Sequence, residues 1–266
     1  MTPAEKAAYN LTLVREKKPL IHNITNYVVM NYTANALLAL GASPVMAHAV
    51  NEVEEMVSFA GALVINIGTL SDHWISAMIA AGKKASEKGT PIILDPVGSG
   101  ATRLRTETAK RIIKETSLSV IRGNASEILS LRRENSKTKG VDSIHSVDEA
   151  ANAAKILAQE LKTTLAITGA VDLITDGTRT LRVHNGHPLM GYVTGTGCTA
   201  TVVIGAFLAV DNDPVTAAAT GLAYFGLAGE KAAQSASAPG SYMIALLDAL
   251  YTITPEELQY GAKITS

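Results

Sequence analysis

Short apolar runs alternate along the chain with longer segments in which hydrophobic residues recur every three or four positions. The apolar runs carry few charges and are bounded by glycine, proline or polar residues. This pattern is typical of strands buried on both faces of a parallel sheet, and the longer segments have the periodicity of helices that cover such a sheet. The runs predict strands at 20–24, 43–46, 62–67, 91–96, 119–122 and 164–168.

Local signals predict where the helices begin and end. Thr2, Pro3 and Glu5 form the pattern of a capping box with proline at the first helical position, which predicts a helix to about Lys17. Similar caps and terminal glycines bound the other helices. These are expected from Thr25 or Asn26 to Gly41, after Asn51, over 72–88 and 106–115, after Asn124, from a capping box at Ser146 to about 161, from Asp213 to about 234, over 241–251 and from Thr254.

Asp176 and Gly177 separate two short strand-like segments, 172–175 and 180–183, and predict an antiparallel hairpin. Elsewhere strands alternate with helices, which requires parallel strands joined by crossover helices. We therefore expect a single α/β domain over residues 1–266, doubly wound, with a mostly parallel sheet flanked by helices on both faces. Ligands of such folds bind beyond the carboxyl ends of the strands.

The stretch from Gly191 to Cys198 leads into an apolar segment, 199–210, that is hydrophobic on nearly every face and predicts a buried helix. Gly195 and Gly197 let the backbone approach a ligand closely, and the first N–H groups of a helix attract negative charge. The expected ligand is a phosphate. A plain tight turn into a core helix would use the same glycines.

Polar residues follow the predicted strands where a ligand is expected. Asp95 offers a carboxylate of the kind that holds Mg²⁺, although an Asx turn would use it equally well. Glu127 falls in the first turn of a helix, a position that the helix dipole alone favours. The guanidinium of Arg122 has planar donors that suit phosphate, and pairing with a nearby carboxylate is the alternative.

Met46 and Cys198 each allow two interpretations. Met46 follows a strand, where it either fills the core or lines an apolar ligand pocket. Cys198 begins the buried helix, where the helix dipole is expected to lower the thiol pKa, whereas buried cysteines are usually inert. The sequence places no histidine beside it. We therefore expect a polar or weakly basic role next to a substrate hydroxyl rather than covalent catalysis.

Composition restricts the classes of function. Of the 266 residues, 47% are hydrophobic and 18% are charged, which is enough apolar surface for a large core. The net charge of -1 gives no electrostatic basis for binding nucleic acid or an anionic membrane. A single cysteine is typical of the reducing cytosol, so a cytoplasmic protein is expected. The histidines show no helical i, i+4 pair, so no zinc site is expected.

Several motifs occur together and in one order: 22–26 (HNITN), 35–46, 62–69, 94–98, 121–124 with Glu127, 167–169 and 195–198 (GTGC). In these motifs the chain resembles hydroxyethylthiazole kinase, the thiamine-salvage family of the ribokinase-like superfamily. The resemblance implies transfer of the γ-phosphoryl group of ATP to the primary alcohol of 4-methyl-5-(2-hydroxyethyl)thiazole, with Mg²⁺ required. It implies that Met46 and Gly195 contact the thiazole alcohol, with Asn26 as a further candidate, and that Arg122 and Thr168 contact ATP.

The resemblance also implies that Asp95 and Glu127 position Mg²⁺ through water. The anion hole for the transferred phosphoryl group would consist of Gly195, Thr196, Gly197 and Cys198. A homotrimer with the thiazole site between subunits is implied, whereas the adenine contacts are not readable. The helix from Pro214 is a candidate wall for the adenine.

Most ribokinase-like enzymes have an aspartate base where this chain has Cys198, and the thiazole kinases share the cysteine. That feature argues against a dehydratase of hydrated NAD(P)H on the same fold, which would carry aspartate there. A second alternative is a thiazole sensor without catalysis. Such a protein would not need Asp95, Glu127 and Arg122 at the strand ends.

Overall fold

The computed structural model describes residues 1–132 and 147–266, with the side chains of 147–150 excepted. Within these residues the strands form one sheet in the order β2-β1-β3-β4-β5-β6-β7-β8-β9. Pairing is parallel from β2 to β6 and antiparallel from β6 to β9. The strands are β1 Leu20–Ile24, β2 Ser43–Val45, β3 Ala62–Asn66, β4 Ile92–Asp95, β5 Val120–Asn124, β6 Thr164–Thr168, β7 Asp172–Thr175, β8 Thr180–Val183 and β9 Ile264–Thr265.

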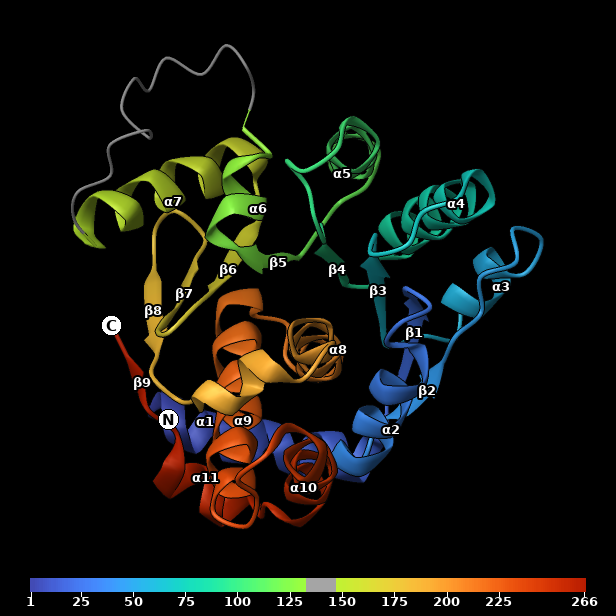
Figure 1. The fold of residues 1–266 in the computed structure, drawn as a ribbon. Coiled ribbons are helices and arrows are strands. Elements are labelled where there is room, and N and C mark those ends of the chain that lie inside the picture. Colours follow the sequence, from blue (N-terminus) through green and yellow to red (C-terminus); the bar gives the residue numbers. More distant parts are fainter. Residues whose placement is uncertain (133–146) are drawn as a thin grey trace.

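Helices cover both faces of the sheet, which curves around α8 and α9 (Figure 1). On the concave side lie α1 Pro3–Lys17, α2 Met30–Leu40, the 3-10 helix η2 Pro188–Tyr192, α8 Thr196–Leu208, α9 Pro214–Ala233, α10 Pro239–Thr252 and α11 Pro255–Gly261. On the other side lie α3 Val53–Val57, α4 Asp72–Lys88, α5 Arg103–Glu115, α6 Ala125–Leu129 and α7 Val147–Leu161. The predicted α/β class with a mostly parallel sheet is confirmed.

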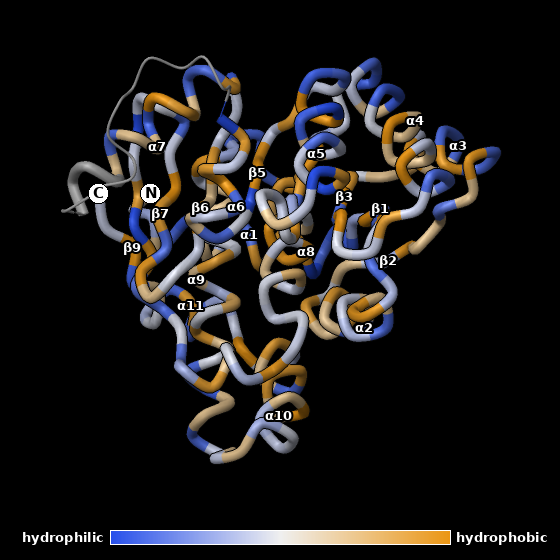
Figure 2. The backbone as a smooth tube through the Cα atoms, turned by 45° about the horizontal axis from the view of Figure 1, so that its top comes forward, coloured by the Kyte–Doolittle hydropathy of each residue, from blue (hydrophilic) through white to orange (hydrophobic). Residues whose placement is uncertain are grey.

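Alternation of side chains along each strand builds two separate cores. On β3, Val64 joins the core formed with α8 and α9, whereas Leu63 and Ile65 join the core formed with α4. Helix α8 is so close to the sheet that a Cβ at Gly205 would lie 2.8 Å from Val64 Cγ2. Figure 2 shows α4 and α7 alternating between hydrophilic and hydrophobic residues, as expected of helices with one face on a sheet.

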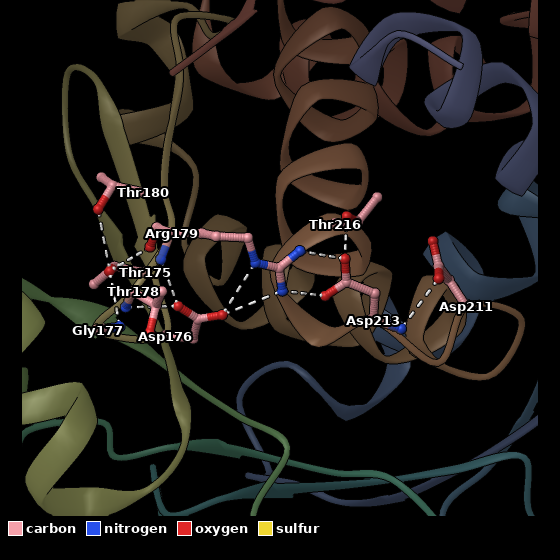
Figure 3. Close-up of polar contacts among 9 residues, drawn as sticks. All are labelled: Thr175, Asp176, Gly177, Thr178, Arg179, Thr180, Asp211, Asp213 and Thr216. Carbon is pink, nitrogen blue, oxygen red and sulfur yellow. Dashed lines mark hydrogen bonds and ion pairs between the residues drawn. The ribbon is translucent and has the colours of Figure 1, made fainter.

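The predicted hairpin is present as β7 and β8, and Asp176 caps its turn by accepting the N–H groups of Thr178 and Arg179. The Arg179 guanidinium then donates two hydrogen bonds of 2.7 Å to the carboxylate of Asp213, just before α9 (Figure 3). Bidentate pairs of this kind fix orientation. The hairpin is thereby tied to α9 at the end of the sheet opposite the carboxyl ends of the parallel strands.

Several predicted boundaries are wrong, because tertiary contacts or other local caps replace the expected ones. Helix α2 begins at Met30, and Asn26 instead accepts the N–H groups of Val28 and Val29 in the turn before it. Helix α5 begins at Arg103, capped by Thr102, rather than at 106. Helices α3 and α10 begin at Val53 and Pro239, and β5 continues to Asn124. The capping box expected at Ser146 lies outside the described residues.

Candidate active site

The carboxyl ends of the parallel strands bring polar side chains from distant parts of the sequence to one place. Asn66 ends β3, Asp95 ends β4 and Thr168 ends β6, while Arg122 lies within β5. Helix α8 packs against β1, β3 and β4, and its first turn lies at the same edge of the sheet. The polar residues at the strand ends therefore lie beside the glycine-rich start of α8, as expected.

Asp95 lies at the centre of this cluster. It is fully buried, and its Oδ2 accepts hydrogen bonds from Thr201 Oγ1 at 2.7 Å and from Asn66 Nδ2 at 3.1 Å. Burial raises the pKa of Asp95 to about 6, although the nearby Arg122 charge and these hydrogen bonds oppose the shift. The carboxylate is therefore costly to keep charged inside the protein, and a cation beside it would stabilise it.

Arg122 connects the carboxylate to the helix start. Its Nη2 donates to Thr168 Oγ1 at 2.5 Å, and its Nη1 lies 3.7 Å from Asp95 Oδ2. A Cβ at Gly197 would lie 2.7 Å from Nη1, so the guanidinium rests directly against the first turn of α8. Of the two interpretations of Arg122, pairing with a carboxylate is present, and the same donors border the cavity described below.

The first turn of α8 has the geometry of an anion site. Gly195 is the N-cap with φ +84, a conformation that favours glycine, and a Cβ there would lie 2.5 Å from Val29 Cγ1. Thr199 N–H makes the first bond within the helix, to Gly195 O at 2.8 Å. The earlier N–H groups, those of Thr196, Gly197 and Cys198, have no acceptor within the helix and lie at its positive end.

Cys198 is partly buried in this turn, and its Sγ lies 3.5 Å from Asn26 Nδ2. Burial raises the pKa of the thiol to about 11, and the negative charge of Asp95 adds to the shift. The expectation that the helix dipole lowers this pKa is therefore wrong, because desolvation and a buried carboxylate outweigh the dipole. The thiol is protonated at neutral pH.

Glu127 lies beside the cluster and is held by the backbone. Its Oε1 accepts Gly98 N–H at 2.8 Å, and its Oε2 accepts Asn124 N–H at 2.9 Å in a capping box. Its charge also acts to raise the pKa of Asp95, which places the two carboxylates within electrostatic reach. Among residues 1–132 and 147–266, no three His, Cys, Asp or Glu side chains form a metal site by themselves.

The order of the strands in the sheet is what relates Met46 to the site. It follows β2, which pairs with β1, and so lies at the same edge of the sheet as Asn26 after β1. It is half-buried. In the part of the chain that the structure describes, Met46 makes none of the hydrogen bonds that join Asn26, Asp95 and Arg122.

A cavity of about 540 Å³ opens from the Arg122 side of the cluster toward α9. Arg122, Thr168 and Gly197 line one end, and Leu222 and Phe225 of α9 line another part. The helix from Pro214 is therefore part of the wall of this cavity, and its contact with adenine stays a prediction. The other lining residues are Gly169, Ala170, Asp172, Asn185, Gly186, His187, Pro188, Met190, Gly191, Thr196, Ala200 and Gly226.

The sequence did not indicate two residues of this region, Thr201 and Asp172. Thr201 lies one turn after Cys198 on α8, and that helical spacing is the signal that could have found it. Asn66 lies at the end of β3, and its hydrogen bond to Asp95 is known only from the structure. In the cavity wall, Asp172 accepts Gly169 N–H at 3.0 Å, and burial raises its pKa to about 6.

Comparison with known proteins gives consistent matches. The sequence model of the protein family described as "Hydroxyethylthiazole kinase family" matches residues 11–256. A hydroxyethylthiazole kinase of Desulfotalea psychrophila is 67% identical over 258 residues, covering 97% of this chain and 94% of that protein. The solved structure of a hydroxyethylthiazole kinase protein from Pyrococcus horikoshii is 47% identical with a TM-score of 0.90, covering 97% of this chain and 98% of that one.

A ribokinase-like superfamily protein of Enterococcus faecalis shares the fold at 14% identity, with a TM-score of 0.63 over 96% of both chains. The ribokinase-like fold expected from the sequence motifs is thereby confirmed.

Proposed function

The chain belongs to the hydroxyethylthiazole kinase family, and on that premise we propose how its residues transfer the γ-phosphoryl group of ATP to the primary alcohol of 4-methyl-5-(2-hydroxyethyl)thiazole. Residues 1–266 act as one kinase domain in this proposal. The observation that carries it is the contact of the Arg122 guanidinium with the first turn of α8 at Gly197, beside Thr168 and Asp95. This arrangement directs cationic and N–H donors into one end of a large cavity.

ATP occupies the cavity, with its phosphates at the end lined by Arg122 and Thr168 and its base toward α9. The transferred phosphoryl group is held by the free N–H groups of Thr196, Gly197 and Cys198. Preorganised donors of this kind stabilise the charge that develops on the equatorial oxygens of a loose transition state. Positioning and electrostatics therefore supply most of the catalysis.

Asp95 and Glu127 fit a magnesium ion held through water. Mg²⁺ keeps several waters and is usually bound by one or two carboxylates together with substrate phosphates, so two acidic groups suffice. The buried Asp95 Oδ1 has no hydrogen-bond partner among the described residues, so one acceptor of this carboxylate is not used by them. The ion would neutralise charge on the phosphates of ATP.

The thiazole alcohol lies on the other side of the α8 turn, against Gly195 and Met46, with Asn26 beside it. Cys198 faces the alcohol as a neutral thiol, since its pKa is about 11. A neutral group positions the hydroxyl and is at most a weak base. The loose transition state tolerates this, because little charge is needed on the attacking oxygen before transfer.

We further propose a cytoplasmic homotrimer with the thiazole site at the subunit interface. Tyr27 and Val28, next to Asn26, are 68% and 65% exposed, and Leu38 on α2 is 59% exposed. Large apolar side chains exposed near the proposed substrate site favour coverage by a second copy of the chain. Sedimentation at the mass of three chains is expected, and a monomer at micromolar concentration would contradict the trimer.

Among the described residues, no helix combines the length and the hydropathy needed to span a membrane.

A coupled ADP-release assay tests the activity. With the thiazole alcohol and Mg·ATP, the wild type is expected to release ADP and form the phosphate ester, identified by mass. Arg122→Ala is expected to lower kcat/KM by about 10²–10³-fold, the usual loss for a removed transition-state donor. Arg103→Ala is the matched control, because Arg103 is exposed and pairs with Glu107 on the surface. Thiazole binding without ADP release would instead support a sensor.

A further inference from the structure

The Asp95 carboxylate is bonded on one side only. Its Oδ2 accepts from Thr201 Oγ1 and Asn66 Nδ2, and Arg122 Nη1 lies 3.7 Å from the same oxygen. Its Oδ1 is buried and has no hydrogen-bond partner within the described residues. Buried carboxylate oxygens in native proteins are nearly always bonded, so an oxygen left free in this way indicates a place for water or an ion.

Thr201 decides which oxygen is used. It is fully buried on α8, one turn after Cys198. Threonine hydroxyls inside helices commonly donate to the carbonyl four residues back. Here that carbonyl, Gly197 O, is 3.3 Å away and Asp95 Oδ2 is 2.7 Å away, so the carboxylate is the closer acceptor. The hydroxyl has a single proton, and donation to Oδ2 holds the carboxylate plane in one orientation.

Asn66 extends the same hydrogen-bond network to Asn26 and Cys198, on the side proposed for the thiazole alcohol. Its Nδ2 donates to Asp95 Oδ2, and its Oδ1 accepts from Asn26 Nδ2 at 2.9 Å. Asn26 Nδ2 also lies 3.5 Å from Cys198 Sγ. Hydrogen bonds therefore run without a break from Thr201 through Asp95, Asn66 and Asn26 to the thiol. Side chains from β3, β4, α8 and the end of β1 are fixed relative to one another.

We propose that Thr201 is a positioning residue for the phosphoryl transfer. Its hydroxyl, assisted by Asn66, occupies Asp95 Oδ2 inside the protein, so that Oδ1 stays unbonded by the described residues and would be the oxygen that accepts from the water of a hydrated magnesium ion accompanying ATP. This inference rests on the proposed function. Groups behind a metal-binding carboxylate orient it, and their removal typically costs about 10–100-fold in metal affinity or activity. Thr201 is fully buried and does not line the cavity proposed for ATP.

Three variants separate the hydroxyl from its packing. Thr201→Val keeps the shape and removes the donor, and Thr201→Ser keeps the donor. Thr33→Val removes a hydroxyl that is equally buried in α2 and, within the described residues, bonds to backbone carbonyls alone. Binding of Mn²⁺ to the enzyme–ADP complex is followed by the electron paramagnetic resonance of free Mn²⁺. The Mg²⁺ dependence of ADP release and the thermal unfolding temperature are measured in parallel.

Thr201→Val is expected to weaken Mn²⁺ binding about 10–100-fold and to raise the half-saturating Mg²⁺ concentration similarly, with the thiazole KM unchanged. Thr201→Ser is expected to restore both, and Thr33→Val to leave both unchanged. Wild-type Mn²⁺ binding in Thr201→Val would overturn the proposal, as would a Thr201→Ser variant as weak as Thr201→Val. If Thr201→Val does not fold, Thr201→Ala removes the hydroxyl without a methyl against Asp95, and the same two outcomes decide.

Failure of the proposed function can be distinguished from failure of the Thr201 proposal. If the wild type releases no ADP with the thiazole alcohol, the kinase assignment is wrong. Mn²⁺ binding to the wild type and to the Thr201 variants still tests the positioning role.

Discussion

Replacing Gly197 with alanine tests the contact on which the proposed mechanism depends. A Cβ at this position would lie 2.7 Å from Arg122 Nη1 and 3.1 Å from Nη2, and contacts under 3.0 Å require something to move. The helix start is fixed by the Thr199 N–H bond to Gly195 O, so the guanidinium is the group expected to move. It would leave Thr168 and Asp95, its two partners.

The energetic terms have opposite signs. Alanine in place of glycine in a helix favours folding by roughly 0.5–1 kcal/mol. Loss of the charged hydrogen bond from Arg122 to Thr168 costs roughly 1.5–3 kcal/mol, before any cost from the weakened pair with Asp95. We expect a net destabilisation of about 1–2 kcal/mol, which lowers Tm by roughly 2–8 °C for a chain of this size. The effect on activity is larger, about 10²–10³-fold in kcat/KM for ATP, because a donor to the phosphates is displaced.

The assay is ADP release at saturating thiazole alcohol with ATP varied, alongside thermal unfolding. Gly240→Ala in α10 is the matched control, because no atom lies within 4 Å of a Cβ there. That control is expected to keep wild-type kinetics. Wild-type kinetics in Gly197→Ala would refute the argument that Arg122 acts at this helix start, and an equal loss in both variants would attribute the defect to something other than the contact.

Three further results are expected. Cys198→Asp should retain or raise kcat at pH 7 and Cys198→Ala should retain part of it, since positioning dominates catalysis; a loss as complete as that of Arg122→Ala would argue against this role. Removal of divalent cations by a chelator should abolish ADP release and added Mg²⁺ should restore it, whereas residual full activity would contradict the roles given to Asp95 and Glu127. The hydrogen bonds from Arg179 lower the pKa of Asp213 from 3.8 to about 2, so the stability that they provide is present above about pH 4 and is lost as the pH falls toward 2. Asp213→Asn should therefore make unfolding, followed by circular dichroism, less dependent on pH in this range. An unchanged pH profile would contradict this expectation.

The order of elements and the place of the site are readable from the sequence because their signals are local. Hydrophobic periodicity identifies the parallel strands, and Asp176 with Gly177 identifies the hairpin. Gly195 and Gly197 mark the helix start, because only glycine suits a positive φ at Gly195 and the close approach of Arg122 to Gly197. Ligands bind at the carboxyl ends of parallel strands, and this rule predicts that Asp95 and Arg122 lie at the same edge of the sheet.

The first and last residues of the helices were less predictable, since several side chains near a helix start can act as its cap. Asn26 has the side chain of a helix cap, yet its amide nitrogen donates to Asn66 and lies within reach of Cys198. Its oxygen caps only the turn ahead of α2. The short strand β9 was not predicted, because two residues carry no periodicity and their pairing with β8 is a tertiary contact.

The sequence by itself determined the fold class, the family motifs and the residue types that gather at the strand ends, because these depend on neighbours within a few positions. Only the tertiary structure decided which oxygen of Asp95 is free, since Thr201 is 106 positions away in the chain. It also decided the state of Cys198. A helix start lowers a thiol pKa, but burial beside a carboxylate raises it, and the depth of burial exists only once the sheet and α8 have come together.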